Sequence, residues 1–259
     1  VGSEMCIRDR LNKNGKLLTI VFLAELESFE YKIFEIMAAD DACNIKTDVK
    51  ATNHSLENSK YKVIFNKNGD IAYLYDKKLG RQAIDSPIKM ALLHNTGSLA
   101  YPSWEIRKED IDKEPFYYAN TPEFSILENG PARASIKIIR QLEKSQLVQI
   151  ISLESDSEYV KENNYIDWRS RRCLLKAVFP TAAHNNKAIY DLGLGVIERG
   201  NNTDKQYEVP AQKWADITDK SGEYGISIFS DSKYGWDKPN DNTLRSVSYT
   251  HLRAHETLM

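Results

Sequence analysis

In the C-terminal half of the chain, the two best-placed pairs of a tryptophan and an aspartate are Asp167-Trp168 and Trp214 with Asp216. Such a neighbourhood suits carbohydrate, because an indole face packs on sugar C–H bonds while a carboxylate accepts hydroxyl protons. The interpretation that we favour is plainer: tryptophans in a core, with aspartates at strand ends. A glycosidase needs two facing carboxyl groups roughly 5–10 Å apart, a distance that sequence spacing in a β fold does not establish.

Other motifs that carry chemistry are missing from the sequence. His54, His94 and His184 have no neighbour at metal-ligand spacing, so each is predicted to lie on the surface or in a loop. No glycine-rich phosphate loop and no Gly-x-Ser-x-Gly elbow is present. Cys43 and Cys173 are too few for a disulfide framework, which favours a reducing compartment.

Two further segments carry side chains that bind ligands in other proteins. Arg169, Arg171 and Arg172 form a basic cluster, which we interpret as a solvated or ion-paired face in preference to an anion site. The aromatic stretch from Tyr101 to Tyr118 contains Trp104 and lies outside regular alternation. It is equally consistent with a ligand-contacting loop at a sheet edge and with a cover for the core.

The elements that must position these residues are β-strands, because apolar side chains recur with a period of two. Tyr61–Phe65 and Ile71–Tyr75 flank a turn in which Gly69 can take a positive φ, so they predict a hairpin. Ala134–Ile138 alternates, and the more apolar Leu147–Leu153 suits a central strand. Short strands between Gly, Asn, Asp and Pro clusters predict an all-β sandwich of antiparallel sheets.

The N-terminal part is less regular. Leu17–Leu26 predicts a buried strand, and we favour a strand over a helix for Phe29–Phe34. The polar stretch Asp40–Ser55 is expected to contain a domain boundary.

Composition excludes some partners. A hydrophobic fraction of 41% and a charged fraction of 28% are typical of a globular protein with a core. The net charge of −2 gives no reason to expect nucleic acid or an anionic membrane as a partner. No apolar run approaches the ~20 residues that span a bilayer.

Both ends of the sequence are expected to be foreign to the protein. Met5–Arg10 can be encoded by a DNA string whose reverse complement, in one frame, encodes Val247–His251. Two unrelated natural termini should not have this relation, and both strings resemble translated sequencing-library adaptors. We therefore exclude residues 1–10 and 246–259 from fold reasoning. Residues 11–245 are expected to be an internal piece of a longer protein.

Several runs resemble, in order and spacing, segments of glycoside hydrolase family 38, the α-mannosidases. They are Asp167-Trp168-Arg169 with Leu174 to Pro180, Ile197-Glu198-Arg199, Tyr207 to Pro210, Lys213 to Asp216, Tyr224-Gly225 and Lys233-Tyr234-Gly235. Upstream, Leu56–Ile71 and Tyr75–Lys77 resemble the strand pair that opens this region. The resemblance covers essentially all of Leu17–Arg245. Two positions depart from it: Gln206 stands where the family often has arginine, and Gln212 where it often has histidine.

The resemblance implies a large antiparallel two-sheet supersandwich, similar to the galactose mutarotase-like fold, over residues 51–245 and truncated at its C-terminal end. Residues 11–50 would be the C-terminal part of a small β domain. In this family the catalytic carboxylates and the divalent-metal ligands lie in an N-terminal α/β barrel, upstream of Leu11. This fragment is therefore expected to hold no catalytic residue and no metal. Its parent would hydrolyse terminal α-mannosides by a metal-assisted retaining mechanism, with zinc as the expected ion.

The resemblance also implies partners. They are a mannose-containing oligosaccharide and the missing barrel, on which the sandwich would pack. Trp104, Trp214 and Asp216 are candidates for residues that face the barrel or the substrate. A bacterial cytoplasmic parent is favoured by the scarcity of cysteine, and secretion stays open because the natural N-terminus is missing.

Two other functions are alternatives on the sequence. A stand-alone carbohydrate-binding sandwich would require a native start near Leu11. A sugar epimerase of the same superfamily would require two histidines and a carboxylate that converge in a concave sheet, for which His94 and His184 are available. No motif supports that pair, so the α-mannosidase region is the leading interpretation.

Overall fold

The computed structural model describes residues 10–11, 18–19, 21–35, 47–97, 105–231 and 233–250. These residues form five sheets, in which every strand pair is antiparallel, and one short helix, α1 (Lys108–Ile111). The predicted all-β class is confirmed. No helix in this part of the chain is long and apolar enough to cross a membrane.

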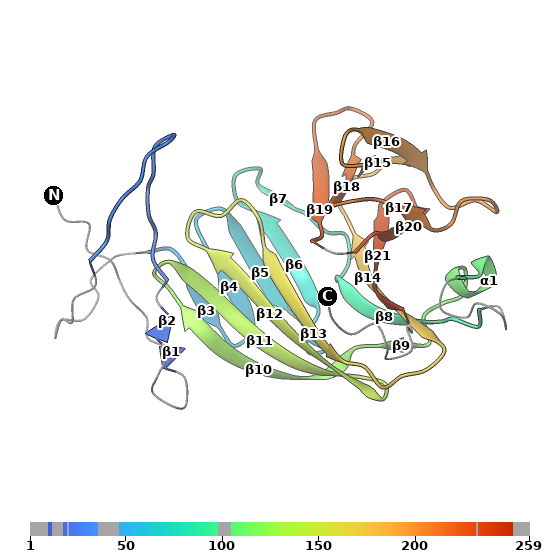
Figure 1. Cartoon of the computed structure of the whole chain (residues 1–259), viewed down its shortest axis with the longest axis horizontal. Helices are drawn as coiled ribbons and strands as arrows, with labels where there is room; N and C mark the ends of the chain where they lie inside the picture. Colours follow the sequence, from blue (N-terminus) through green and yellow to red (C-terminus); the bar gives the residue numbers. More distant parts are fainter. Residues whose placement is uncertain are drawn as a thin grey trace.

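Two sheets lie face to face in the centre of the molecule (Figure 1). The first has the order β3 (Lys50–Thr52), β4 (Ser55–Glu57), β5 (Tyr61–Phe65), β6 (Ile71–Asp76) and β7 (Arg81–Gln82). The second has the order β10 (Asn120–Asn129), β11 (Arg133–Leu142), β12 (Ser145–Glu154) and β13 (Lys161–Asp167). Alternate side chains of both sheets, such as Leu56, Val63, Ile136 and Ile151, meet in one buried core. Period-two alternation thus produces the predicted sandwich.

A third sheet continues the packing beside the first two. Its order is β17 (Val209–Pro210), β20 (Gly235–Asn240), β21 (Thr243–Thr250), β14 (Cys173–Pro180), β8 (Lys89–His94) and β9 (Tyr117–Tyr118). Its central strands are buried on both faces. On β14, Cys173 and Leu175 join one core with Leu142 and Leu147 of the second sheet, while Leu174 joins another core with residues around α1.

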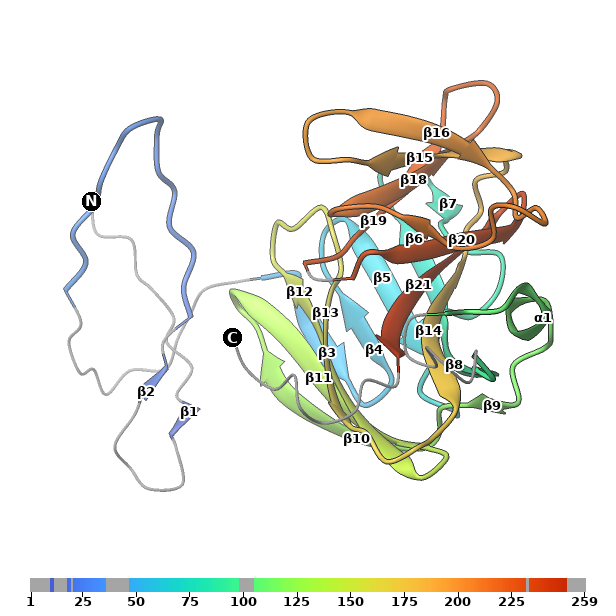
Figure 2. The same cartoon turned by 45° about the vertical axis from the view of Figure 1, so that its right-hand side comes forward.

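A fourth sheet lies above the third in both views (Figure 2). Its order is β16 (Val196–Gly200), β15 (Lys187–Asp191), β18 (Trp214–Thr218) and β19 (Gly225–Phe229). Tyr190, Ala215 and Ile217 from this sheet pack on Trp236 and Leu244 of the third sheet. One face of this sheet is therefore buried. The alternate side chains of each strand point to the other face.

The hairpin predicted around Gly69 is confirmed by the pairing of β5 with β6. Gly69 has a φ of +84°, and a Cβ there would lie 2.8 Å from the Cδ atom of Arg140. Glycine is therefore needed for both the backbone conformation and the close approach. The central strand predicted over Leu147–Leu153 is also confirmed, within β12.

The N-terminal predictions were wrong in detail. The expected buried strand over Leu17–Leu26 is reduced to β2 (Leu18–Thr19), which pairs with β1 (Arg10–Leu11). Leu23 and Leu26 are exposed, and Phe29–Phe34 is neither strand nor helix, with Phe29 in a turn at a φ of 62°. This segment, blue in Figures 1 and 2, projects away from the sandwich. The rings of Phe22 and Phe34 contact each other with centroids 5.0 Å apart, but without a facing layer most apolar side chains of this segment are exposed.

The C-terminal strand β21 runs across residue 245, where our sequence prediction placed an adaptor boundary. Ala177 pairs with Ser246, and Lys176 pairs with Val247. The foreign origin of the terminal residues and the three boundaries between the four expected segments stay predictions.

Candidate functional site

Two of the three candidate residues lie on one exposed face of the fourth sheet. Trp214 and Asp216 belong to β18, whose intervening residues Ala215 and Ile217 are buried. Because side chains alternate along a strand, Trp214 and Asp216 point away from the core. Trp104 lies outside the described residues.

The carboxylate of Asp216 is held by neighbouring hydroxyl groups. Ser227 donates its Oγ hydrogen to Oδ2 across the sheet at 2.7 Å, and Thr218 donates its Oγ1 hydrogen to Oδ1 at 2.6 Å. Ser227 is directly opposite Asp216 in the register of β18 and β19. The carboxylate is thus oriented by neutral donors at the surface of the sheet.

The aromatic side chains of this face are also paired. Trp214 is opposite Phe229, which is 72% exposed, and Asp216 is opposite Ile189 on its other side. We call the surface made by Ile189, Trp214, Asp216, Ser227 and Phe229 the outer face. Its mixture of aromatic rings and an oriented carboxylate suits contact with a sugar or with another protein surface.

The other Trp–Asp neighbourhood has a different environment. Asp167, the last residue of β13, forms a 2.6 Å ion pair with Arg169. Trp168 packs against the core that contains Leu142 and Leu147. The favoured interpretation of a core tryptophan with a strand-end aspartate therefore holds here and not at Trp214. The ion pair also confirms the expected role of Arg169.

A buried ionic network was missed by the sequence analysis. Lys176 is fully buried and donates hydrogen bonds to Asp237 and, at 2.5 Å, to Oε2 of Glu208. Asp237 also accepts from Arg245, with Nε–Oδ2 at 2.9 Å, and from Nδ2 of Asn202 at 2.9 Å. A lysine inside the apolar run Leu174 to Val178 was the available signal, because a charge there needs a partner.

The two carboxyl groups of the network differ in their pKa. Burial raises the pKa of Glu208 and outweighs the opposing effect of Lys176. Burial also acts to raise the pKa of Asp237, but Lys176 and Arg245 outweigh it, so this pKa lies below its usual range. Asp237 is therefore the fixed negative charge on which the network depends.

The network fastens the segment around α1. Nη2 of Arg245 donates to the backbone oxygen of Ile111 at 3.2 Å, and the hydroxyl of Tyr207 donates to the backbone oxygen of Ile106 at 3.0 Å. Ile106 and Ile111 pack in the core that contains Leu174. The residues that directly follow Trp104 are thus held on the third sheet.

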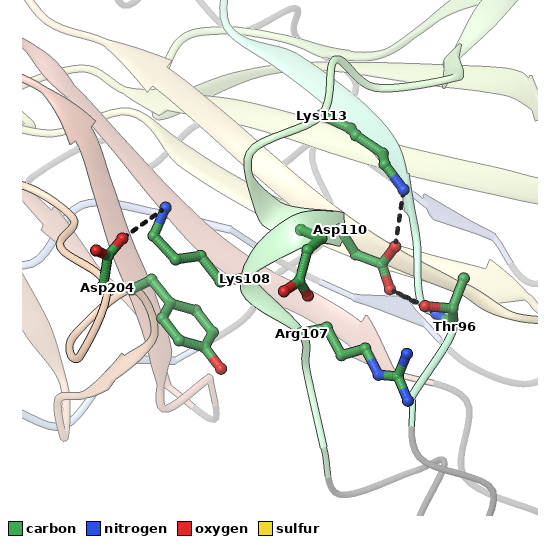
Figure 3. Close-up of a pocket in the computed structure, with 8 residues that line it drawn as sticks. Thr96, Arg107, Lys108, Asp110, Lys113 and Asp204 are labelled. Atoms are coloured by element: carbon green, nitrogen blue, oxygen red, sulfur yellow. Dashed lines mark hydrogen bonds and ion pairs between the residues drawn. The ribbon is translucent and has the colours of Figure 1, made fainter.

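A cavity of about 690 Å³ lies beside α1, between this helix and the loop that precedes β17 (Figure 3). The residues that line it are Thr96, Arg107, Lys108, Glu109, Asp110, Lys113, Asp204 and Tyr207. Asp110 is 1% exposed and accepts from the backbone nitrogen of Thr96 at 2.6 Å and from its hydroxyl at 2.7 Å. These two hydrogen bonds from Thr96 hold the pKa of Asp110 below its usual range, although burial acts in the opposite direction.

The described aromatic residues of this stretch are divided: Tyr117 packs on the core, whereas Phe116 and Tyr118 are exposed. The ring of Phe116 stacks on His94 with centroids 4.4 Å apart, and Tyr117 packs beside Met90 and Leu92. Both interpretations stay open for residues 101–104, which are outside the described part.

The structure separates the two histidines that an epimerase would need. His94 is opposite Cys173 at the start of β14, whereas His184 follows Pro180 at the end of that strand and contacts Oδ2 of Asp85 at 2.8 Å. An eight-residue strand is roughly 25 Å long, so these imidazoles do not converge. Within the described residues, no three His, Cys, Asp or Glu side chains are grouped as metal ligands.

Comparisons with known proteins identify the family. Residues 56–247 match the model of the glycosyl hydrolases family 38 C-terminal domain, and the chain belongs to that family. The α-mannosidase of Saccharomyces cerevisiae is 25% identical over 203 residues, which are 70% of this chain and 18% of the yeast protein.

Two solved structures from Enterococcus faecalis have a similar fold. One is a protein in glycosyl hydrolase family 38, with a TM-score of 0.68 and 16% identity over 83% of this chain and 28% of that one. The other is an α-mannosidase, with a TM-score of 0.63 and 15% identity over 81% of this chain and 27% of that one. The chain spans less than a third of each of these three proteins.

Proposed function

We propose that this chain is the non-catalytic β-sandwich region of an α-mannosidase that hydrolyses terminal α-mannosides in mannose-containing oligosaccharides. The observation that carries the proposal is the family match, which covers the whole of the second and fourth sheets and most of the first and third. The yeast relative and one of the two structural relatives are α-mannosidases. A glycosidase in this family is the parent that agrees with all of these comparisons.

The non-catalytic role is supported by where the carboxylates lie. Asp167 and Asp216 are in different sheets, the first paired with Arg169 and the second held by Ser227 and Thr218. Asp237 and Glu208 are engaged in the buried network. None of these side chains forms a pair that faces an open site, which a retaining glycosidase requires at a separation of about 5 Å.

The metal-assisted retaining mechanism belongs, in this proposal, to residues outside this chain. A divalent ion such as zinc needs three or four converging protein ligands. The described residues do not offer such a set. They fit the role of a support for the catalytic domain instead.

We further propose that the outer face packs against the catalytic domain or its substrate. The exposed Phe229 lies opposite the half-buried Trp214, and the oriented carboxylate of Asp216 is on the same face. Exposed aromatic side chains with a fixed polar group are typical of the centre of an interface. Trp104 stays a candidate for the same role, since it directly precedes the fastened segment at Ile106.

The experiment compares three proteins in hydrolysis of 4-nitrophenyl α-mannoside: this chain, the longer protein that contains it, and that protein with Trp214→Ala. We expect no turnover by the chain and zinc-dependent turnover by the longer protein. Trp214→Ala should lower kcat/KM about tenfold, the effect of losing one good contact. Tyr159→Ala, an exposed tyrosine in the loop before β13, is the control and should leave kcat/KM within about twofold.

Each result bears on a separate part of the proposal. Turnover by the chain alone would overturn the non-catalytic role. A longer protein with no α-mannosidase activity would overturn the proposed parent. If Trp214→Ala and Tyr159→Ala have the same kcat/KM, the outer face contacts neither the catalytic domain nor the substrate.

A further inference from the structure

A chain of polar side chains crosses the inner face of the second sheet. Arg140 of β11 is 2% exposed and donates from Nη1 to Oδ1 of Asp70 at 2.7 Å. Its Nη2 donates to Oε1 of Gln149 on β12, and Nε2 of Gln149 donates to Oε1 of Glu162 on β13 at 2.6 Å. Hydrogen bonds thus join the buried carboxylate of Asp70 to the half-buried carboxylate of Glu162.

One donor of this chain has no partner within the described residues. Nε of Arg140 is buried and makes no hydrogen bond there, although Nη1 and Nη2 of the same guanidinium are both bonded. A Cβ at Gly69 would lie 2.8 Å from Cδ of Arg140, so the backbone at Gly69 packs closely on this side chain. Buried donors are normally satisfied by protein atoms or by ordered water, because an unpaired one is costly.

A cavity of about 10 Å³ lies beside Arg140, where the first, second and third sheets meet. We call it the junction cavity. Its polar wall belongs to the second sheet and is formed by the chain from Arg140 to Glu162. The other walls are apolar and include Ile71 of the first sheet and Met90 and Ala177 of the third. The junction cavity therefore offers a few polar groups in an otherwise apolar space.

Size and charge select what the junction cavity can hold. A cavity needs roughly 10–15 Å³ to hold a water molecule, so this one has room for a single water and for nothing larger. The charge of Arg140 is already balanced by Asp70, which leaves no excess positive charge for an anion. The guanidinium itself would repel a cation. A neutral molecule that both accepts and donates hydrogen bonds is what fits these walls.

We propose that the junction cavity binds one ordered water molecule. Its oxygen accepts from Nε of Arg140, and its hydrogens can be donated to the carboxylate of Glu162 and to the amide oxygen of Gln149. Internal waters make about three such hydrogen bonds to buried polar groups. The water would satisfy the last donor of the guanidinium and make the polar chain complete at the point where three sheets meet.

The test is NMR spectroscopy of the 259-residue chain, in which an NOE between water and a methyl group reports internal water. We expect NOEs from water to the methyl groups of Ile71 and Met90, with the sign of a water that tumbles with the protein. Leu142 and Leu147 are fully buried and do not line the cavity, so their methyl groups should show none. A crystal structure should show a density peak roughly 2.7–3.2 Å from Nε of Arg140.

Ala177→Val removes the space for the water. It adds two methyl groups to the wall of the junction cavity, and the water NOE at Met90 should be lost. Ala119→Val is the matched control, because Ala119 is buried in the same apolar core as Ala177 and does not line the cavity. The NOE should remain in this control. If neither variant folds, the NOEs and the density peak of the unchanged chain decide.

Three results would overturn the proposal. Absence of the NOE at Met90, or of the density peak beside Arg140, would show that the junction cavity is dry. An NOE that survives Ala177→Val would come from exchanging guanidinium protons and not from a bound water. A bromide ion that takes the place of the density peak after soaking would show that the site selects an anion.

Discussion

Carboxylates have opposite environments in the buried network and on the outer face. Asp237 is fully buried and accepts hydrogen bonds from Lys176, Arg245 and Asn202. Asp216 lies at the surface of its sheet and accepts from the hydroxyls of Ser227 and Thr218. Loss of the first carboxylate would leave Arg245 without a counter-charge and Lys176 with Glu208 as its one remaining carboxylate partner. Loss of the second would leave two hydroxyls that water can reach.

This difference bears on the runs that identify the family. The stretch from Tyr207 to Asp216 supplies Glu208 to the network and both Trp214 and Asp216 to the outer face. One continuous motif thus contains a residue that stabilises the fold and residues that are free for contact. Membership of a motif therefore does not assign a residue to chemistry; its environment does.

The largest expected effect comes from Asp237→Ala. Removing one partner of a buried ion pair costs about 3–5 kcal/mol, because the remaining charges stay buried. Lys176 and Arg245 would both lose their main partner. We expect the free energy of unfolding, measured by urea titration, to fall by about this amount or the chain to fail to fold.

Glu208→Gln is the control that separates charge from packing. Burial raises the pKa of Glu208, in contrast to Asp237, and a glutamine oxygen can still accept a hydrogen bond from Lys176. We expect Glu208→Gln to lower the free energy of unfolding by about 1 kcal/mol. If Glu208→Gln lowers the free energy of unfolding as much as Asp237→Ala does, the network does not depend mainly on Asp237.

A smaller effect is expected at Lys238, the neighbour of Asp237 in the sequence. Lys238 is buried and donates to three neutral oxygens, namely Asn185 O at 2.5 Å, Asn201 Oδ1 at 2.7 Å and Asn240 O at 2.7 Å. Burial lowers its pKa from 10.5 to about 8. Between pH 8 and pH 10.5 the unfolded chain holds a proton that the folded chain has released, so the free energy of unfolding rises with pH in this window.

Lys238→Met removes that dependence. The stability of the unchanged chain minus that of the variant should grow by about 1–2 kcal/mol from pH 8 to pH 10, measured by urea unfolding. Burial raises the pKa of Cys173 from 9.0 to about 11, so stability falls with pH in that range. That contribution is common to both proteins and cancels in the difference. If the difference in stability between the two proteins does not change with pH, burial does not lower the pKa of Lys238.

Period-two alternation was enough to predict the all-β class, the hairpin at Gly69 and the central strand β12, because each depends on local pattern. It could not predict the buried network, whose members Lys176, Glu208, Asp237 and Arg245 come from four separate segments joined only by the sheet order. The cavity beside α1 could not be predicted for the same reason. Leu23 and Leu26 were misjudged because burial requires a facing layer, which a strand pattern does not supply.

The smallest effect is expected for Asp216→Ala. Ser227 is exposed, so its hydroxyl and that of Thr218 can donate to water when the carboxylate is removed. Removing a hydrogen-bonded group at the surface costs less than about 1 kcal/mol, which a urea titration beside Asp237→Ala would resolve. A loss above about 2 kcal/mol would show that the outer face contributes to folding, and the contrast with the network would not hold. A small loss would mean that Asp216 is not required for the stability of this chain, and its reason for lying beside Trp214 would then have to be sought in what the outer face contacts.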